Sequence, residues 1–456
     1  MTEAVDRLVQ HVISTRFEDL SAAAVTAVKT FFLDTIGVSV AGTTAPYAAE
    51  VYDAVCAWGA GEEATVLGVG NRLPAGAAAM VNAFHAHNQE FDCVHEAAVV
   101  HPLTTIQSAA LAFIERSGGV SGRELILALA LGVDVAASIG MAAKTGLRFF
   151  RPATAGVFGA TAAVSKLAGL DEVRLKNALG LAYAQNSGTM QSHIEGGPAL
   201  ALQMGFASSA ALRAVDLALA GLPGPHDVLE GPFGYLRLYE GEWDLKPVWA
   251  ELGTVWRITQ VSHKPFPTGR AAHGGLDGIL QLRASHGLHA EDVARLALSA
   301  PPLIHQLVGR PAEPDMDVTY ARLCFQYVGA LALLYGGVDV ADFSPQRLAD
   351  PRLHAVAKRI DLVADGNPDP NALAPQAVTA QLAGGRTLQV EVPFTLGSPE
   401  RPLSRDQYLA KFRRCWSHSA RPLAQEAAER LVHLVDALEE VDNCNKIAAL
   451  TRPDGG

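Results

Sequence analysis

Apolar residues recur at three- and four-residue spacing through most of residues 3–250, and alanine dominates these stretches. This spacing is typical of α-helices with one buried face. Many of the stretches are apolar nearly all round, which indicates helices packed inside a large helical domain. Two helix starts carry capping signals: Ser121 with Glu124 three residues later, and Asp171 before a second apolar run.

The pattern changes near residue 254. β-Branched and alternating residues predict strands at 254–261 and 292–300, and a hairpin over 376–394 that turns at Gly384-Gly385. Helical spacing returns at 269–284 and 318–335. This mixture predicts a smaller α+β domain of roughly 130 residues after the helical region.

After Pro402 the helical pattern resumes. Ser404 and Gln407 form a capping signal, and helical spacing continues past residue 440. Periodicity alone leaves open whether this tail joins the first helical domain.

Composition narrows the classes of function. A chain of 456 residues is long enough for two domains. The net charge of −11, without any Lys/Arg-rich run, argues against a nucleic-acid groove. The five cysteines are widely spaced and form no C-x-x-C pair, which favours a reducing compartment. Apolar runs such as 125–133 and 198–212 are shorter than a membrane span needs, and the first residues lack the plan of a signal peptide. We therefore expect a cytoplasmic protein without a membrane segment.

Titratable residues concentrate in the segment 90–105 (EFDCVHEAAVVHPLTT). Glu90, Asp92 and His95 are expected within one or two helical turns. His101 precedes a proline, which ends one segment just ahead of a helix beginning near Thr104. A histidine there can act as general acid or base, because its pKa lies near neutral pH.

Two other interpretations of this segment remain open. His101 can be a buried structural residue bonded to a carboxylate. The side chains of His85, His87, Asp92, His95 and His101 also form a pool of metal ligands. No histidine pair has HExxH-type spacing, so no metal site is predicted.

A second cluster occupies 262–275 (SHKPFPTGRAAHGG). Thr268 is predicted to cap a helix that places Arg270 and His273 on one face, with Lys264 just before it. A helix start with a guanidinium is typical of an anion site, and a lysine beside other cations has the lowered pKa that a base requires. The alternative is an exposed turn with ordinary surface charges.

Two further stretches carry isolated polar residues. Tyr327 lies in an apolar helical pattern at 320–337, and Arg151 precedes a helix of small residues within 146–171. Tyr327 alone is more typical of a core phenol. Arg151 is equally compatible with an anion contact and with a structural role.

Taken in order, four stretches of the chain resemble the MmgE/PrpD family: FFLDTIGVSVAG, NAFHAHNQEFDCVHEAAVVHP, RPATAGVFGATAAVSKLAGLD and SHKPFPTGRAAH. The family includes dehydratases of 2-methylcitrate, decarboxylases of cis-aconitate and epimerases of iminodisuccinate. The resemblance implies an all-helical domain built from 1–260 and 396–456, with an α+β domain inserted at 261–395. It also implies an active site between the domains, no obligatory cofactor and a homodimer.

The resemblance also implies roles for individual residues. The family's acidic residue falls on Glu90 or Asp92, its histidine on His101, its lysine on Lys264 and its tyrosine on Tyr327. The chain departs from the family pattern at three places. It has Cys93-Val94 in place of Asp-Thr, Arg151-Pro152-Ala153 in place of His-Pro-Thr, and no Lys-Arg pair in 199–205.

The implied chemistry is removal of a proton α to a carboxylate of a small di- or tricarboxylate. Lys264 and His101 are the candidate bases. Tyr327 and Asp92 are the other expected catalytic residues. The expected substrate-binding residues are Glu90, His95, Arg151, Arg270 and His273. Because the dehydratase contacts are changed, we expect an epimerase of an amino- or imino-dicarboxylate such as iminodisuccinate. The alternatives are a dehydratase of a 2-methylcitrate-like hydroxy acid and, after it, a decarboxylase. From other classes, a hydrolytic metalloenzyme and a non-catalytic anion-binding protein stay open.

Overall fold

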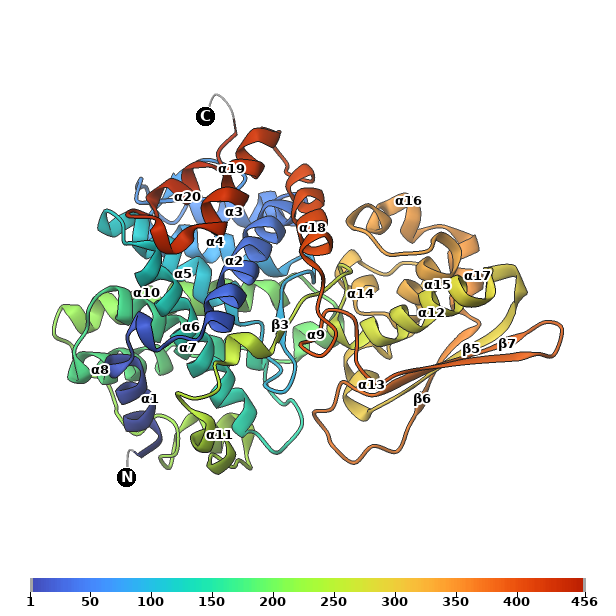
Figure 1. The fold of residues 1–456 in the computed structure, drawn as a ribbon, viewed down its shortest axis with the longest axis horizontal. Coiled ribbons are helices and arrows are strands. Elements are labelled where there is room, and N and C mark those ends of the chain that lie inside the picture. Colours follow the sequence, from blue (N-terminus) through green and yellow to red (C-terminus); the bar gives the residue numbers. More distant parts are fainter. Residues whose placement is uncertain (1–2, 454–456) are drawn as a thin grey trace.

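The computed structural model describes residues 3–453, which form two lobes of unequal size (Figure 1). Helices from both ends of the chain build the larger lobe, and a segment between them builds the smaller one with its sheet. The predicted fold class, mainly helical with a smaller α+β part, is confirmed. The exact domain boundaries at 260/261 and 395/396 stay a prediction.

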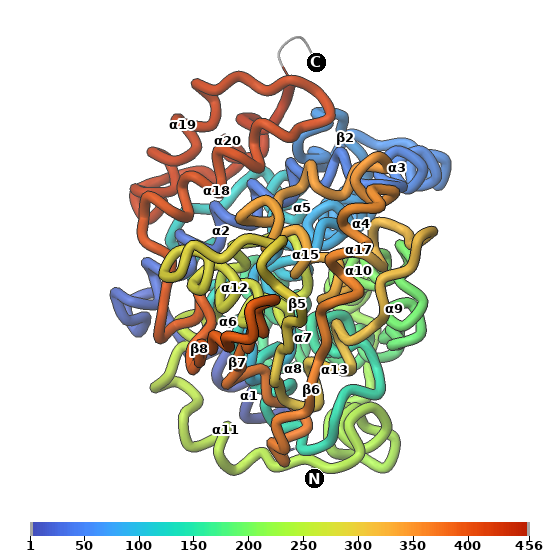
Figure 2. The backbone as a smooth tube through the Cα atoms, turned by 90° about the vertical axis from the view of Figure 1, so that its right-hand side faces the viewer, coloured from blue at the N-terminus to red at the C-terminus, as the bar shows by residue number. Residues whose placement is uncertain are grey.

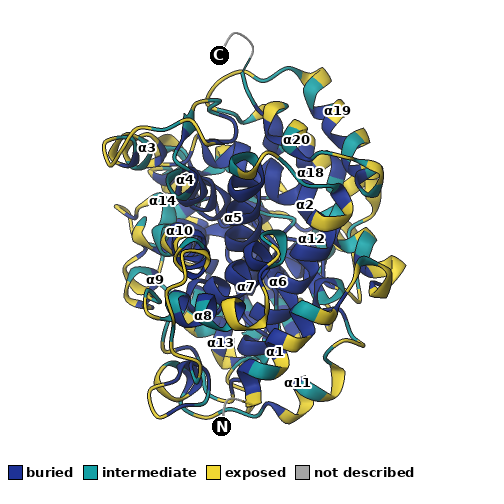
Figure 3. Ribbon diagram, turned by 90° about the vertical axis from the view of Figure 1, so that its left-hand side faces the viewer, coloured by how far each residue is buried: buried dark blue, intermediate teal, exposed yellow. Residues whose placement is uncertain are grey.

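The larger lobe has a core of apolar helices that pack along their length. Its principal helices are α1 (Glu3–Ser14), α2 (Ala22–Gly42), α3 (Ala48–Cys56), α4 (Ala75–His87), α5 (Pro102–Ser117), α6 (Gly122–Ala142), α7 (Arg151–Leu167), α8 (Glu172–Tyr183) and α10 (Ala199–Leu219). Helices α5, α6 and α7 are almost wholly buried (Figure 3). At the α6–α7 crossing, a Cβ on Gly159 would lie 2.8 Å from Ala136 Cβ, so glycine permits the close approach.

The tail of the chain returns to the larger lobe (Figure 2). Its helices are α18 (Arg405–Ser417), α19 (Gln425–Asp436) and α20 (Asn445–Ala449). Helix α18 packs against α2, where a buried ion pair joins Lys411 Nζ to Asp34 Oδ1 at 2.8 Å. Ser404 and Gln407 form the predicted capping box of α18, as Ser121 and Glu124 do for α6.

The smaller lobe is a four-stranded sheet of order β6-β5-β7-β8 with helices packed on it. The strands are β5 (Val293–Ala300), β6 (Ile360–Ala364), β7 (Gln376–Leu382) and β8 (Thr387–Val392). β5 runs parallel to β6 and antiparallel to β7, and the predicted β7–β8 hairpin turns at Gly384-Gly385. Helices α12 (His273–His286) and α15 (Phe325–Tyr335) pack together, and α12 contacts β7 and β8.

Several local predictions are wrong. Residues 254–261 do not form a strand, because Arg257–Gln260 form a 3-10 helix (η3) whose first amide donates to buried Asp134 at 2.8 Å. Only β4 (Val261–Ser262) is extended, and it pairs with β3 (Val94–His95). The helix predicted at 318–335 is broken between α14 (Val318–Arg322) and α15.

Two helices are long and apolar enough to cross a membrane by length and composition alone, namely α2 and α6. Their most apolar windows are 67% and 94% buried inside the fold, respectively. Both therefore have the burial of core helices in the folded chain.

Candidate functional site

The connection between α4 and α5 carries the candidate catalytic side chains. The prediction that Glu90, Asp92 and His95 share a helix is wrong, because α4 ends at His87 and Glu90 adopts a left-handed φ of 50°. This irregular turn brings Glu90 and Asp92 back towards the end of α4. His101 lies directly before Pro102, the first residue of α5, so the predicted junction is confirmed two residues earlier than Thr104.

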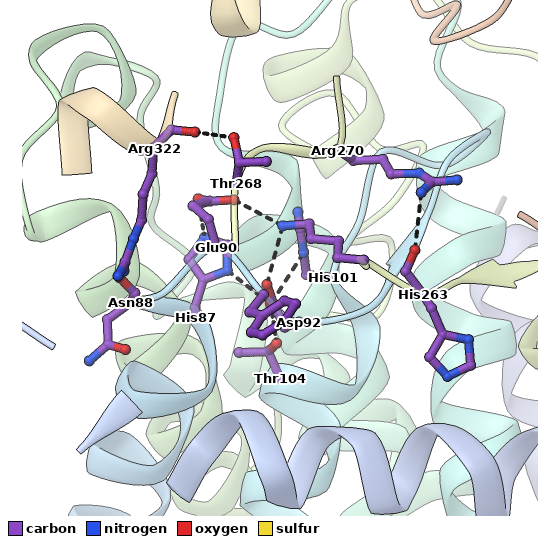
Figure 4. Close-up of polar contacts among 12 residues, drawn as sticks. His87, Asn88, Glu90, Asp92, His101, Thr104, His263, Thr268, Arg270 and Arg322 are labelled. Carbon is purple, nitrogen blue, oxygen red and sulfur yellow. Dashed lines mark hydrogen bonds and ion pairs between the residues drawn. The ribbon is translucent and has the colours of Figure 1, made fainter. Parts of the chain in front are cut away.

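The carboxylate of Asp92 is the centre of the cluster (Figure 4). Its Oδ2 lies 2.9 Å from His87 Nδ1 and 3.2 Å from His101 Nδ1, and it accepts a hydrogen bond from the Thr104 hydroxyl. Asp92 therefore orients two histidines from two different helix ends through one oxygen.

Glu90 and Lys264 complete the cluster. Lys264 Nζ lies 2.9 Å from Glu90 Oε2 and 3.5 Å from Asp92 Oδ1, and its side chain is fully buried. His87 Nε2 lies 3.4 Å from Glu90 Oε1. The strand pair β3–β4 brings the segment that carries Lys264 against the segment that carries Asp92.

Both carboxylates are held ionised. Burial alone would raise the pKa of Glu90, but the charges of Lys264, His87 and His101 outweigh it and lower that pKa to about 2. The pKa of Asp92 also lies well below its ordinary value, because the charges of His101, His87 and Lys264 outweigh its burial. Asp92 and Glu90 are therefore counter-ions in this site.

The two histidines of the cluster are pushed in opposite directions. Burial opposes a charge on His87, yet the nearby Asp92 and Glu90 carboxylates raise its pKa. Burial lowers the pKa of His101. The negative charge of Asp92 opposes this effect, but the positive charge of Lys264 adds to it. Titratable groups with pKa values moved apart are typical of an acid and base pair. Their rings meet edge to face, with centroids 4.9 Å apart.

A mostly apolar cavity lies against this cluster, between the two lobes. Its polar lining includes His87, Glu90, His101 and His193 from the larger lobe. Its remaining lining residues are Val94, Val99, Leu147, Phe150, Pro152, Met190, Gly269, Arg270, Ala271, Leu307, Leu323 and Leu373. Lys264 and Asp92 do not line it and lie behind Glu90, His87 and His101.

Three predicted substrate contacts are engaged within the protein. The guanidinium of Arg270 pairs with Glu96 at 2.8 Å and donates to the carbonyls of His263 and Leu396. His273 Nε2 lies 3.1 Å from the Thr268 carbonyl oxygen. His95 contacts Gln260 and lies in a separate surface hollow.

The predicted cap at Thr268 is wrong. The hydroxyl of Thr268 donates to the Arg322 carbonyl, and Gly269 precedes a 3-10 turn η4 (Arg270–Ala272) before α12 starts at His273. Arg322 in turn donates to the Asn88 carbonyl at 2.8 Å, which ties the smaller lobe to the α4–α5 connection.

Arg151 and Tyr327 are not brought to the cavity. Arg151 forms a buried bidentate pair with Glu240 at 2.9 and 2.8 Å. The hydroxyl of Tyr327 donates to the Asp342 carbonyl at 3.0 Å inside the smaller lobe. Both contacts correspond to the structural alternatives that the sequence left open.

His87, Asp92 and His101 place possible metal-ligating atoms within 4.8 Å of one another. The Lys264 ammonium lies 3.5 Å from the same Asp92 carboxylate, so a divalent cation would meet direct repulsion there. The expectation that the site uses no metal remains a prediction.

His87 is the residue that sequence reasoning did not place in the catalytic group. It appeared only in the pool of metal ligands, because it belongs to an apolar helix 14 residues before His101. The signal available was its position at the end of α4, next to the acidic turn. The left-handed turn at Glu90 brings Glu90 and Asp92 back against His87, and the sequence does not show this turn.

Comparison with known proteins places the chain among carboxylate-processing enzymes. The MmgE/PrpD N-terminal domain matches residues 6–248, and the MmgE/PrpD C-terminal domain matches residues 266–439. Human cis-aconitate decarboxylase is 28% identical over 93% of this chain and 89% of its own length. Cis-aconitate decarboxylase of Aspergillus terreus is 25% identical over 87% of this chain and 86% of its own length. The 2-methylcitrate dehydratase of Cupriavidus necator is 26% identical over 53% of this chain and 52% of its own length. The chain belongs to the MmgE/PrpD family.

Proposed function

We propose that this protein is a lyase of a small polycarboxylate and that its side chains supply acid/base catalysis. The observation that carries this proposal is the pair of histidines on Asp92, of which His87 has a raised and His101 a lowered pKa beside the cavity. The raised pKa of His87 favours a proton donor, and the lowered pKa of His101 favours a proton acceptor at the same site.

Decarboxylation of an unsaturated tricarboxylate such as cis-aconitate is the reaction we propose first. Cis-aconitate decarboxylases are relatives along nearly the whole chain. In this reaction the bond to the leaving carboxylate breaks and CO2 departs. The electron pair forms a new double bond as the old one shifts, and one proton adds to the carbon at its far end. The reaction therefore needs one proton donor, and His87 lines the cavity with a raised pKa, which favours its protonated form.

Dehydration of a hydroxy acid is the second candidate. It needs a base for the proton α to the carboxylate and an acid for the departing hydroxyl, roles that fit His101 and His87. The match to 2-methylcitrate dehydratase covers about half of the chain, so this reaction stands after decarboxylation.

The epimerase preference gains no support from the relatives named above. Epimerisation by two groups needs an acid and a base on opposite faces of one carbon. His87 and His101 share one carboxylate oxygen and have ring centroids 4.9 Å apart, so both approach from the same wall.

The test is incubation of the purified protein in D2O with cis-aconitate, 2-methylcitrate and iminodisuccinate, followed by proton NMR. We expect loss of CO2 from cis-aconitate with one deuteron incorporated into the product. Water elimination from 2-methylcitrate alone would select the dehydratase. Inversion of iminodisuccinate, without CO2 loss or water loss from any substrate, would contradict the proposed lyase.

A further inference from the structure

A polycarboxylate needs positive charge around it, yet most cations near the cavity already have carboxylate partners. Lys264 pairs with Glu90, Arg151 with Glu240 and Arg270 with Glu96. These pairs leave little positive charge for a substrate.

Arg310 is different. It follows α13 (Pro302–Val308), which contributes Leu307 to the cavity wall. Among residues 3–453 no carboxylate forms an ion pair with it. Its Nη2 donates to the His193 carbonyl at 2.7 Å, and its guanidinium lies 4.9 Å from the centroid of the Tyr320 ring. Its Nη1 is buried and has no hydrogen-bond partner in this part of the chain.

His193 connects Arg310 to the cavity. It lies in the short helix α9 (Gln191–Glu195) and lines the cavity. Arg310 Nη2 also lies 3.2 Å from His193 Nδ1. A guanidinium has only donors, so Nδ1 must accept and the proton of the neutral ring is on Nε2. Nε2 has no hydrogen-bond partner within the described residues.

The state of the ring is consistent with this donor role. Burial and the charge of Arg310 lower the pKa of His193 to about 4, so the ring is neutral near pH 7. Glu90 acts electrostatically on both His193 and Arg310. Both residues therefore lie within electrostatic reach of the catalytic cluster, but neither belongs to it.

We propose that Arg310 and His193 form a carboxylate-binding subsite of this cavity, which anchors a substrate carboxylate that does not react. The Nε2–H of His193, which lines the cavity, is its donor. Arg310 holds His193 from behind through Nη2 and supplies the positive charge that Lys264, Arg151 and Arg270 do not. This subsite rests on the proposed function, because it gives the polycarboxylate its orientation towards His87 and His101.

The test is binding of tricarballylate, a saturated and unreactive tricarboxylate, measured by calorimetry with the full-length protein. We expect Arg310→Gln to weaken binding by about tenfold or more, since the positive charge behind His193 is lost. Arg310→Lys should recover part of the loss. The matched control is Arg347→Gln, because Arg347 also stacks on a tyrosine, at 4.0 Å from the Tyr335 ring, but its contacts are with Tyr335, Asp342 and Ser344, none of which lines the cavity.

A second variant guards against misfolding of the first. His193→Phe removes the Nε2 donor while Arg310 stays, and we expect weaker tricarballylate binding with an unchanged melting temperature. The subsite would be overturned if the wild type does not bind tricarballylate. It would also be overturned if the dissociation constants of both variants stay within about twofold of the wild-type value. Binding that depends on Arg310 without turnover of any substrate in the D2O panel would retain the subsite and reject the proposed lyase.

Discussion

At the scale of single residues, Asp92 explains why two similar histidines differ. His87 lies 2.9 Å from Asp92 and also faces Glu90, so two negative charges favour its protonated form. His101 shares Asp92 at 3.2 Å, but its charge is opposed by burial and by Lys264. Burial and neighbouring charges therefore favour His87 as a proton donor and His101 as a proton acceptor.

The structure gives Lys264 a different role from that of a cavity-lining base. It is buried, and it neutralises Glu90 and Asp92 from behind the cavity wall. The predicted catalytic role of Lys264 is untested, but its contacts indicate that it positions the carboxylates that hold His87 and His101.

We expect Lys264→Met to destabilise the fold by about 3–5 kcal/mol, because it leaves two buried carboxylates without their cation. The pKa values of Glu90 and Asp92 should rise in this variant. Urea unfolding at neutral pH measures the change.

The matched control is the double variant Lys264→Met/Glu90→Gln, which removes a buried charge of each sign and should recover part of the lost stability. A single variant as stable as the wild type would show that the ion pairs contribute little. Full substrate-proton exchange in a folded Lys264→Met protein would exclude Lys264 as the essential base.

At the scale of elements, the sequence predicts best where a signal is local. The capping boxes at Ser121 and Ser404 and the hairpin turn at Gly384-Gly385 are each encoded within a few residues, and all are present. The strand predicted at 254–261 fails because buried Asp134, more than 100 positions away, accepts the hydrogen bond of the Arg257 amide. β-Branched residues favour a strand, but this tertiary contact decides otherwise.

The candidate site shows the same limit. Asp92 and His101 are recognisable, because they interrupt an apolar run and precede a proline. The partners of Arg151 and Arg270 are not recognisable, because Glu240 and Glu96 lie 89 and 174 positions away. Spacing identifies which side chains are charged, while only the fold shows which charges are already neutralised.

At the scale of the whole molecule, the site depends on both lobes. The cavity takes His87, Glu90 and His101 from the larger lobe, and Gly269, Arg270 and Leu323 from the segment that enters the smaller one. The tail contributes as well, because Lys411 of α18 donates to the Phe91 carbonyl next to Asp92 at 2.9 Å. At the other chain end, the Asn88 side chain donates to the Gly42 carbonyl at the end of α2 at 2.9 Å, so segments from both chain ends hold the α4–α5 connection in place.

Stability should fall as the pH falls below the ordinary histidine pKa. Burial lowers the pKa of His85, His95 and His193 from 6.5 to about 4. Between these values the unfolded chain binds protons that the folded chain does not, so each histidine contributes stability that is lost as the pH falls from 6.5 towards 4. The raised pKa of His87 acts in the opposite direction, as do the pKa values of Asp34 and Asp134, which burial raises.

We expect the free energy of unfolding at about pH 5 to be lower than at about pH 7, by about 1–2 kcal/mol for each of the three histidines. Urea unfolding at the two pH values measures this difference. The variant His85→Gln should show a smaller difference than the wild type. Equal stability of the wild type at both pH values would refute the lowered pKa values of the three histidines.

The most direct test of the proposed proton transfer is turnover of cis-aconitate by His87→Gln, measured as CO2 release beside calorimetric binding of tricarballylate. The control is His85→Gln, which replaces another buried histidine that does not line the cavity. We predict that His87→Gln lowers turnover by about 10²–10⁴-fold while binding stays within a few fold. Wild-type turnover in a folded His87→Gln protein would contradict the assignment of His87 as the proton donor.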